Sequence, residues 1–265
     1  MIKEEFDLTI HGHNFRACYV RHNKPVPAHY PTLVFMHDSL GCIELWRDFP
    51  EKLALATGLN AFIYDRQGYG KSDPFSEPRT LDYLQKEADV LARMLEQVEI
   101  DSAIIFGHSD GGSIGLIAAA EYPEKVACVI SEAAHVFVDR LTIQGILNTK
   151  AVYQNTNLRE RIARYHGNKA EAVFFAWTET WLAEWYQGWS IEKFLARIQC
   201  PVLAIQGELD EFGTQSQLYS IVRHVGGIAQ PCLLPGVGHT PHKDMPEPVI
   251  EVTAQFISDT VPLKG

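Results

Sequence analysis

Residues 103–120 constrain the fold of this 265-residue chain more than any other stretch. The apolar residues 103–106 predict a buried strand, and the small and apolar residues after the next turn predict a helix. Only Gly-His-Ser-Asp-Gly, residues 107–111, connects the two. A chain that reverses from strand to helix over so short a turn must hold Ser109 in a strained conformation, with its hydroxyl above the sheet. The glycines of the turn lack the Cβ atoms that would collide there.

Ser109 has the surroundings of a nucleophile. The helix that follows it offers unpaired N–H groups and the positive end of its dipole. Gly-x-Ser-x-Gly by itself is common by chance, but between a strand and a helix it is typical of a nucleophile elbow. The expected chemistry is attack of the hydroxyl on a carbonyl carbon, with the resulting oxyanion held by N–H groups.

Short apolar segments alternate with helical ones over most of the chain. The predicted strands are a hairpin at 6–20 and the segments 32–36, 60–64, 103–106, 126–130, 201–205 and 231–234. The predicted helices include 46–57, 81–98, 214–224 and 246–257. This alternation predicts an α/β fold, a mostly parallel twisted sheet with helices on both faces. Ligands of such sheets bind beyond the carboxyl ends of the strands, where Ser109 falls.

Residues 133–197 interrupt this alternation. They contain no clear strand and hold four of the five tryptophans. We therefore predict a helical cap, residues 133–197, inserted into an α/β core formed by residues 1–132 and 198–265.

The cap tryptophans are candidate pocket residues. Trp177, Trp181 and Trp185 recur every four residues, so we expect them near one face of a helix that ends at Gly188. Some of these rings are expected to pack the cap onto the core. Trp177 and Trp181 are our candidates for substrate contact.

The preferred base for Ser109 is His239, because a serine hydroxyl is a poor nucleophile until a base takes its proton. His239 follows the strand 231–234 and precedes the last predicted helix. It therefore lies on a loop at the same edge of the sheet as Ser109. His242, three residues further on, is the alternative base.

Asp210 is the preferred acid that would orient the histidine and stabilise its charged form. It follows the strand 201–205, one strand before the histidine loop. The alternatives are Glu208 and Glu211 on the same loop, and Glu132 at the end of the strand before the cap.

The oxyanion needs two N–H donors. The first is expected from Asp110, directly after the nucleophile. The second is expected from the loop after the strand 32–36, where either Ser39 or Leu40 supplies it.

These motifs together resemble the α/β-hydrolase fold superfamily over nearly the full chain. They are His-Asp-Ser-Leu-Gly at 37–41, Asp-Arg-Gln-Gly-Tyr-Gly-Lys-Ser at 65–72, Gly-His-Ser-Asp-Gly-Gly at 107–112, and the pair Gly-Glu-Leu-Asp at 207–210 with Gly238-His239. The order serine, acid, histidine is also that of the superfamily. The chain is similar to a branch of small carboxylesterases with a Gly-x-Ser-Asp-Gly-Gly elbow. Asp38 stands where the superfamily commonly has glycine.

The resemblance implies a serine hydrolase that cleaves a small carboxylic ester, thioester, lactone or amino-acid ester, with Ser109, Asp210 and His239 as its triad and no cofactor. One hypothesis is that the Asp110 carboxylate binds an ammonium group of the substrate. The alternative is that it accepts hydrogen bonds from neighbouring loop N–H groups.

Two other functions remain open. A C–C bond hydrolase of the vinylogous β-diketone type would use the same triad with basic cap residues; Arg159, Arg161 and Arg164 are the candidates, although their spacing equally fits a solvated helix. A non-catalytic ligand receptor on the same fold is the third hypothesis, and the intact serine, acid and histidine argue against it.

Charge and cysteine content narrow the function classes. A formal net charge of −10 argues against binding to nucleic acid or an anionic membrane. The five cysteines are scattered without a Cys-x-x-Cys pair, so we expect neither a disulfide framework nor a metal site. Residues 1–7 lack the apolar core of a signal peptide, and no run of 18 apolar residues occurs, so we expect a cytoplasmic protein. The oligomeric state is left open.

Overall fold

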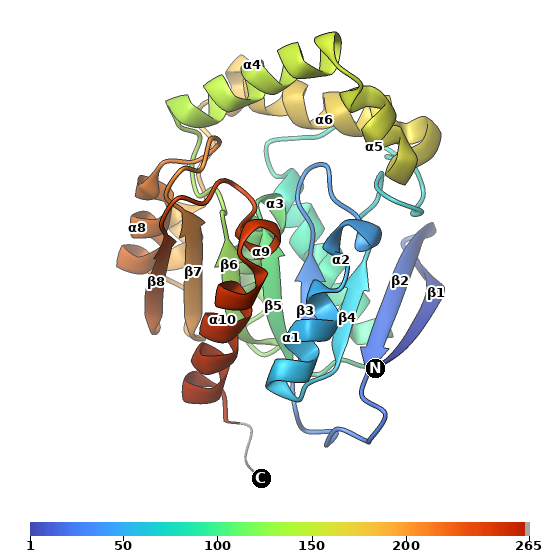
Figure 1. The fold of residues 1–265 in the computed structure, drawn as a ribbon, viewed down its shortest axis with the longest axis vertical. Helices are drawn as coiled ribbons and strands as arrows, with labels where there is room; N and C mark the ends of the chain where they lie inside the picture. The colour runs from blue at the N-terminus through green and yellow to red at the C-terminus, as the bar shows by residue number, and fades with distance from the viewer. Residues whose placement is uncertain (263–265) are drawn as a thin grey trace.

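The computed structural model describes residues 1–262, which form an eight-stranded sheet between helices (Figure 1). The strand order is β1-β2-β4-β3-β5-β6-β7-β8. A hairpin of β1 (Ile2–Ile10) and β2 (His13–Arg21) pairs antiparallel with β4 at one edge. The parallel strands are β3 (Thr32–Met36), β4 (Ala61–Tyr64), β5 (Ala103–His108), β6 (Val126–Glu132), β7 (Val202–Gly207) and β8 (Ala229–Leu234). The predicted α/β fold is confirmed.

Alternate residues of the central strands pack into two separate cores. In β5, Ala103 and Ile105 belong to the core beneath α2 and α3, whereas Ile104 and Phe106 belong to the core beneath α1 and α10. The helices around the sheet are α1 (Phe49–Thr57), α2 (Tyr83–Gln97), α3 (Asp110–Glu121), α8 (Gln215–His224), α9 (Pro241–Asp244) and α10 (Pro246–Thr260). Burial of both faces explains why these strands are continuous apolar runs in the sequence.

The first predicted helix, 46–57, is wrong at its start. The chain forms a short 3₁₀ turn at Ile43–Trp46, and Arg47 then takes a positive φ of 54°. The helix α1 begins at Phe49, with Pro50 in its first turn, where proline sacrifices no helical hydrogen bond.

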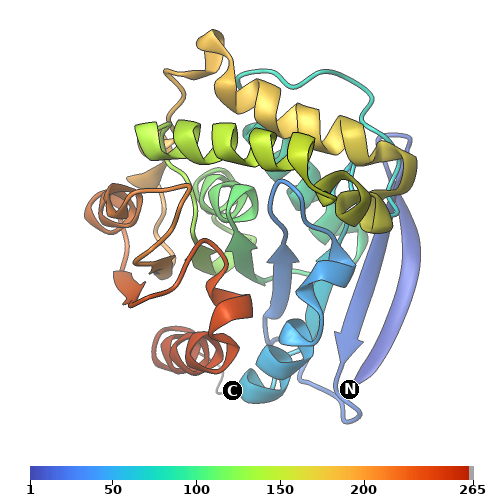
Figure 2. The same ribbon diagram turned by 45° about the horizontal axis from the view of Figure 1, so that its top comes forward.

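The residues between β6 and β7 lie across the carboxyl ends of the strands (Figures 1 and 2). They form α4 (Arg140–Asn155), α5 (Leu158–His166), α6 (Ala170–Leu182) and the short α7 (Glu192–Leu195). Figure 2 shows α4 and α6 side by side over this end of the sheet, and the two helices are in contact. Ile146 of α4 and Phe174 of α6 join the same hydrophobic cluster as α2 and α3. We refer to residues 133–197 as the cap segment.

The predicted tryptophan face is wrong in its last member. The helix α6 ends at Leu182 rather than at Gly188. Trp185 lies in a following 3₁₀ turn and is 53% exposed. The rings of Tyr186 and Trp189 stack at 5.4 Å and are buried. Burial of these two rings explains why the chain leaves the helix before Trp185.

Candidate active site

Ser109 occupies the turn between β5 and α3. Its backbone has φ 55° and ψ −118°, a conformation that is uncommon outside glycine and marks local strain. A Cβ on Gly107 would lie 2.2 Å from the Gly111 carbonyl oxygen, and one on Gly111 would lie 2.0 Å from the carbonyl oxygen of Met36. The two glycines therefore allow the strand, the helix and β3 to approach this closely.

We expect Gly111→Ala to lower the free energy of unfolding by about 1–3 kcal/mol, because its methyl group meets a backbone carbonyl that cannot rotate away. Urea unfolding measures this effect. Gly188→Ala is the matched control, since a Cβ at Gly188 has no neighbour within 4 Å. Equal stability of the two variants would contradict the steric argument.

Three side chains from three loops form a chain of hydrogen bonds above the sheet. Ser109 Oγ donates to Nε2 of His239 at 3.0 Å. Nδ1 of His239 donates to Oδ1 of Asp210 at 2.8 Å. The loops follow β5, β7 and β8, which end at the same edge of the sheet. The arrangement can take the proton of the serine hydroxyl and hold the resulting imidazolium.

Asp210 is fixed by its own loop. Its Oδ1 also accepts the N–H groups of Phe212 at 2.9 Å and Gly213 at 3.2 Å. Burial opposes ionisation of Asp210, but the charge and hydrogen bond of His239 outweigh it and hold the pKa of Asp210 below its usual value. Burial likewise lowers the pKa of His239, but Asp210 outweighs it, so that pKa lies above its usual value. The two residues therefore stabilise each other as an ion pair of the Asp210 carboxylate and the His239 imidazolium.

The alternative acids on this loop have other partners. Glu208 Oε2 accepts the N–H of Gly236 at 3.0 Å. Glu211 Oε2 accepts the backbone N–H of His239 at 3.2 Å rather than a ring nitrogen. Both carboxylates therefore brace the histidine loop, and the imidazole is oriented by Asp210.

Glu132 and His242 form a second histidine–carboxylate pair. Glu132 accepts the backbone N–H of His242 at 2.7 Å and also its ring Nδ1. Nε2 of His108 donates to the carbonyl oxygen of His239 at 2.8 Å. One nitrogen of His108, one of His242 and a carboxylate oxygen of Glu132 lie within 4.8 Å of one another, a spacing at which such atoms could hold a metal ion. Because one nitrogen of each ring and both oxygens of Glu132 already bind within this group or to the backbone of residues 239–242, the cluster anchors the loop that carries His239.

Two of the three expected oxyanion donors, Asp110 and Ser39, have a backbone N–H without an acceptor in the part of the chain that the structure describes. The N–H of Asp110 is the first of α3 and has no partner within the helix. Leu40 N donates to Oδ2 of Asp38 at 3.3 Å. Ser39 N, in contrast, has no hydrogen-bond acceptor among residues 1–262. Of the two expected second donors, Ser39 is therefore the one left available.

The side chain of Asp110, which lines the cavity beside Ser109, has partners that neither expectation named. It is 1% exposed, and both of its oxygens lie 3.3 Å from the Tyr83 hydroxyl. Nη2 of Arg66 lies 3.6 Å and Nη2 of Arg79 3.8 Å from its Oδ2. Two guanidinium groups already balance this carboxylate, so we do not propose that it binds a substrate ammonium group. Its partners are side chains rather than loop N–H groups.

A cavity of about 190 Å³ opens beside Ser109 and His239. Its walls come from both parts of the chain. The core contributes Asp38, Ser39, Leu40, Phe212 and Lys243, and the cap segment contributes His135, Thr142, Ile146, Thr149, Trp177 and Trp181. The two tryptophans singled out from the sequence thus line this cavity, on the side opposite the sheet.

His135 lines the cavity and was overlooked in the sequence. Its Nε2 donates to the carbonyl oxygen of Phe212 at 2.9 Å, and its ring centre lies 5.9 Å from that of His239. Burial, with the nearby His239 as a smaller contribution, lowers the pKa of His135. Its position in the chain does indicate a place near the site, because His135 follows the end of β6 at the edge of the sheet where Ser109 lies.

Two polar side chains of the cap segment, His166 and Lys169, bind the core loops 37–41 and 65–72. His166, the last residue of α5, accepts the N–H of Gly70 at 2.9 Å and donates to the carbonyl oxygen of Leu40 at 3.0 Å. Lys169 donates to the carbonyl oxygens of Tyr69 and Ser72. The cap segment therefore contacts the loop that carries Ser39.

A sequence profile of the alpha/beta hydrolase fold matches residues 31–184, more than half of the chain. The chain belongs to the alpha/beta hydrolase fold family. The serine hydrolase BPHL of Homo sapiens is a relative within this family, 28% identical over 174 residues, which are 62% of this chain and 58% of that protein. The match thus spans somewhat over half the length of the curated relative.

Solved structures share the alpha/beta hydrolase fold along the whole chain. MGS-M2, an alpha/beta hydrolase enzyme from a Medee basin deep-sea metagenome library, has a TM-score of 0.78 at 17% identity, over 96% of this chain and 98% of that one. The enol-lactonase from Burkholderia xenovorans LB400 has a TM-score of 0.76 at 16% identity, over 95% and 99%. Similarity at this level of identity concerns the fold.

Proposed function

We propose that this protein is a serine hydrolase that cleaves small carboxylic esters through an acyl-enzyme. The observation that carries the proposal is the chain from Ser109 to His239 at 3.0 Å and on to Asp210 at 2.8 Å, at the wall of a cavity. The likeness to a human serine hydrolase supports it. We take these three residues as a catalytic triad.

In this mechanism Ser109 Oγ attacks the acyl carbon while Nε2 of His239 takes its proton. The carbonyl oxygen becomes an oxyanion, held by the N–H groups of Asp110 and Ser39. The imidazolium returns the proton to the leaving alcohol, and an acyl-enzyme remains. Water, deprotonated by His239, then releases the acid and restores Ser109. Asp210 orients the imidazole throughout, and these steps use no cofactor.

The size of the cavity favours small substrates. Its volume of about 190 Å³ is below the roughly 300–1,000 Å³ of pockets for drug-sized ligands. We expect p-nitrophenyl acetate and butyrate to be cleaved roughly tenfold or more faster, as kcat/KM, than the palmitate, because a long chain must displace packed cap side chains. A preference for the palmitate would contradict a small-ester enzyme.

The test of the mechanism is labelling with a fluorophosphonate, followed by mass spectrometry of the modified peptide. An adduct on Ser109 is the expected result. Folded protein that carries no adduct, or an adduct on another serine, would overturn the proposal. Slow single turnover with tight product retention would favour the receptor hypothesis instead.

No feature of the described chain favours the C–C bond hydrolase. Arg159, Arg161 and Arg164 are absent from the residues that line the cavity, and Arg159 instead lies 3.3 Å from Glu171 at the surface. A dienol substrate assayed by absorbance separates the two reactions. Ester hydrolysis is therefore the reaction that we propose.

The proposal includes two statements about setting. We propose that residues 133–197 act as a cap over the substrate, and that the enzyme works in the reducing cytoplasm, since the five cysteines are free in the described residues. No helix in residues 1–262 has the length and apolar character needed to cross a membrane.

A further inference from the structure

Arg66 is a buried cation that the mechanism above does not use. It lies directly after β4, in the turn 65–72, and its side chain is fully buried. Its Nη2 donates to the carbonyl oxygen of Asp38 at 3.0 Å and lies 3.6 Å from Oδ2 of Asp110. One guanidinium nitrogen thus contacts a backbone carbonyl next to one proposed oxyanion donor, Ser39, and the side chain of the other, Asp110.

The Asp38 carbonyl sets the direction of the Ser39 N–H, because both belong to one planar trans peptide unit and point opposite ways. This carbonyl also accepts a hydrogen bond from Nδ1 of His37 at 2.8 Å. Nε2 of His37 accepts the backbone N–H of Arg66 at 3.0 Å, which fixes the tautomer of the ring. Burial, and then the charge of Arg66, hold the pKa of His37 well below its usual value, so the ring keeps this neutral form.

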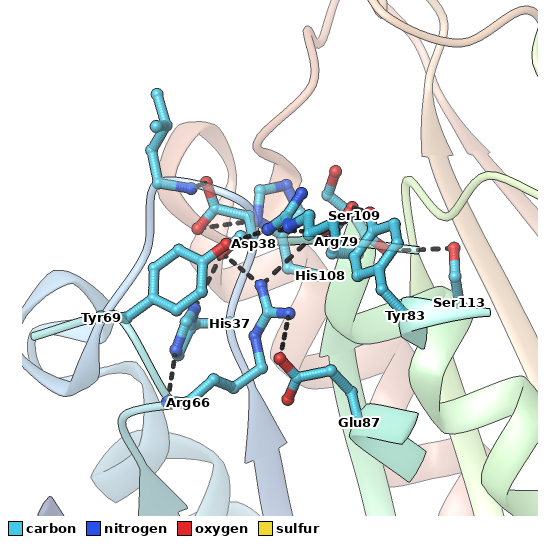
Figure 3. A network of polar contacts seen from close by, with 12 residues as sticks. His37, Asp38, Arg66, Tyr69, Arg79, Tyr83, Glu87, His108, Ser109 and Ser113 are labelled. Atoms are coloured by element: carbon cyan, nitrogen blue, oxygen red, sulfur yellow. Dashed lines mark hydrogen bonds and ion pairs between the residues drawn. The ribbon is translucent and has the colours of Figure 1, made fainter. Parts of the chain in front are cut away.

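Arg66 belongs to a buried group of charged side chains. It lies beside Asp110, the first residue of α3, and also beside Glu87 of α2. Figure 3 shows its guanidinium between the loop residues His37 and Asp38 and the Glu87 side chain of α2. Glu87 Oε1 lies 3.6 Å from Nη1 of Arg66. With Asp110 and Arg79, the group comprises two guanidiniums and two carboxylates, so its buried charges are balanced. Unpaired buried charges would be strongly destabilising here.

We propose that Arg66 is a positioning residue for the oxyanion hole, which aims the Ser39 N–H through the Asp38 carbonyl and holds the start of α3 through the Asp110 carboxylate. This inference rests on the proposed function. Burial disfavours the charge of Arg66, but Tyr69 and the neighbouring carboxylates outweigh it, so its pKa lies above its usual value and the cation is permanent. A planar guanidinium has several donors in a fixed geometry, whereas an ammonium group is a single point.

The test compares an ester with the corresponding thionoester, in which sulfur replaces the carbonyl oxygen. Sulfur is the weaker hydrogen-bond acceptor, so the ratio of the two rates reports on the oxyanion donors. We expect Arg66→Lys to lower kcat for the ester by about 10- to 100-fold, because a misdirected donor loses part of its stabilisation of the transition state. KM stays within about twofold, and the ratio of ester to thionoester rates falls.

Arg79→Lys is the matched control. It is equally a buried arginine beside Asp110, but its contacts run to Tyr69 and Tyr83 and not to the Asp38 carbonyl. We expect it to lose less of kcat and to keep most of the rate ratio. An equal fall of the ratio in both variants would mean that any loss of buried guanidinium perturbs the site, and would overturn a specific role for Arg66.

If Arg66→Lys does not fold, Glu87→Gln tests the same inference. It removes the carboxylate beside Nη1 and leaves Arg66 in place, so we expect a smaller fall of the ratio in the same direction. An unchanged ratio in the folded variants overturns the inference, even where kcat falls. If the wild-type protein shows neither ester turnover nor an adduct on Ser109, the proposed function is overturned and this inference with it. If the wild-type protein is active and Arg66→Lys has the same ratio of ester to thionoester rates, the inference alone is overturned.

Discussion

Ser109→Ala is expected to lower kcat for a small ester by about 10⁶-fold, because loss of the nucleophile removes the acyl-enzyme route altogether. The variant retains the glycines of the elbow and loses only one hydroxyl, whose partner is Nε2 of His239. Initial rates with p-nitrophenyl acetate, corrected for hydrolysis in buffer, measure the effect.

Ser131→Ala is the control for Ser109→Ala. Ser131 is also buried near the elbow, and its hydroxyl has no hydrogen-bond partner in the described residues. Its removal therefore leaves no acceptor unsatisfied, and we expect turnover close to that of the wild type. Turnover by Ser109→Ala that approached that of this control would overturn the assignment of the nucleophile.

The second largest expected effect belongs to Asp210→Asn, with a loss of kcat/KM of about 10⁴-fold. The amide disfavours the tautomer in which Nδ1 of His239 donates, and it cannot stabilise an imidazolium. Only neutral His239 can accept the serine proton, and Asp210 raises its pKa, so wild-type activity falls as the pH drops through a value above about 6.5. Without the carboxylate, the largest influence that raises the pKa of His239 is lost while burial still lowers it, so this acid limb moves to lower pH. The pH profile of kcat/KM measures both effects.

Glu132→Gln makes the same chemical change in the second histidine–carboxylate pair. His242, its partner, anchors the histidine loop, and within residues 1–262 the imidazole that is hydrogen-bonded to Ser109 is that of His239. We expect a less stable protein with a far smaller loss of turnover and an acid limb that stays in place. If the losses in the two variants were equal, Asp210 would no longer stand apart as the acid.

The parts of the site that sequence located best are those with local signals. The elbow of Ser109 is a strand, a turn and a helix in direct succession, so its shape follows from adjacent residues. The place of Asp210 in the chain distinguishes it only weakly from Glu208 and Glu211, because the three residues lie so close together in the sequence. In the structure, the N–H groups of Phe212 and Gly213 bind Asp210 and turn it toward the imidazole.

Features set by distant partners escaped sequence reasoning. The carboxylate of Asp110 lies beside Arg66 and Arg79, which come from loops far from it in sequence. No local sequence pattern therefore indicates that these residues pair. Trp185 was misplaced for a related reason, because burial of Tyr186 and Trp189 ends the helix that propensity alone would continue. In both cases tertiary contacts override the local signal.

The His166 contacts bear on how such enzymes diverge and are engineered. A cap is often treated as an exchangeable module that selects substrates while the core supplies speed. Here the imidazole at the end of α5 holds the Leu40 carbonyl, in the loop that also carries Ser39. On the function proposed above, a cap transplanted from a homologue without a counterpart of His166 would leave that loop unsupported, so the chimera would acquire a slower chemical step together with its new selectivity.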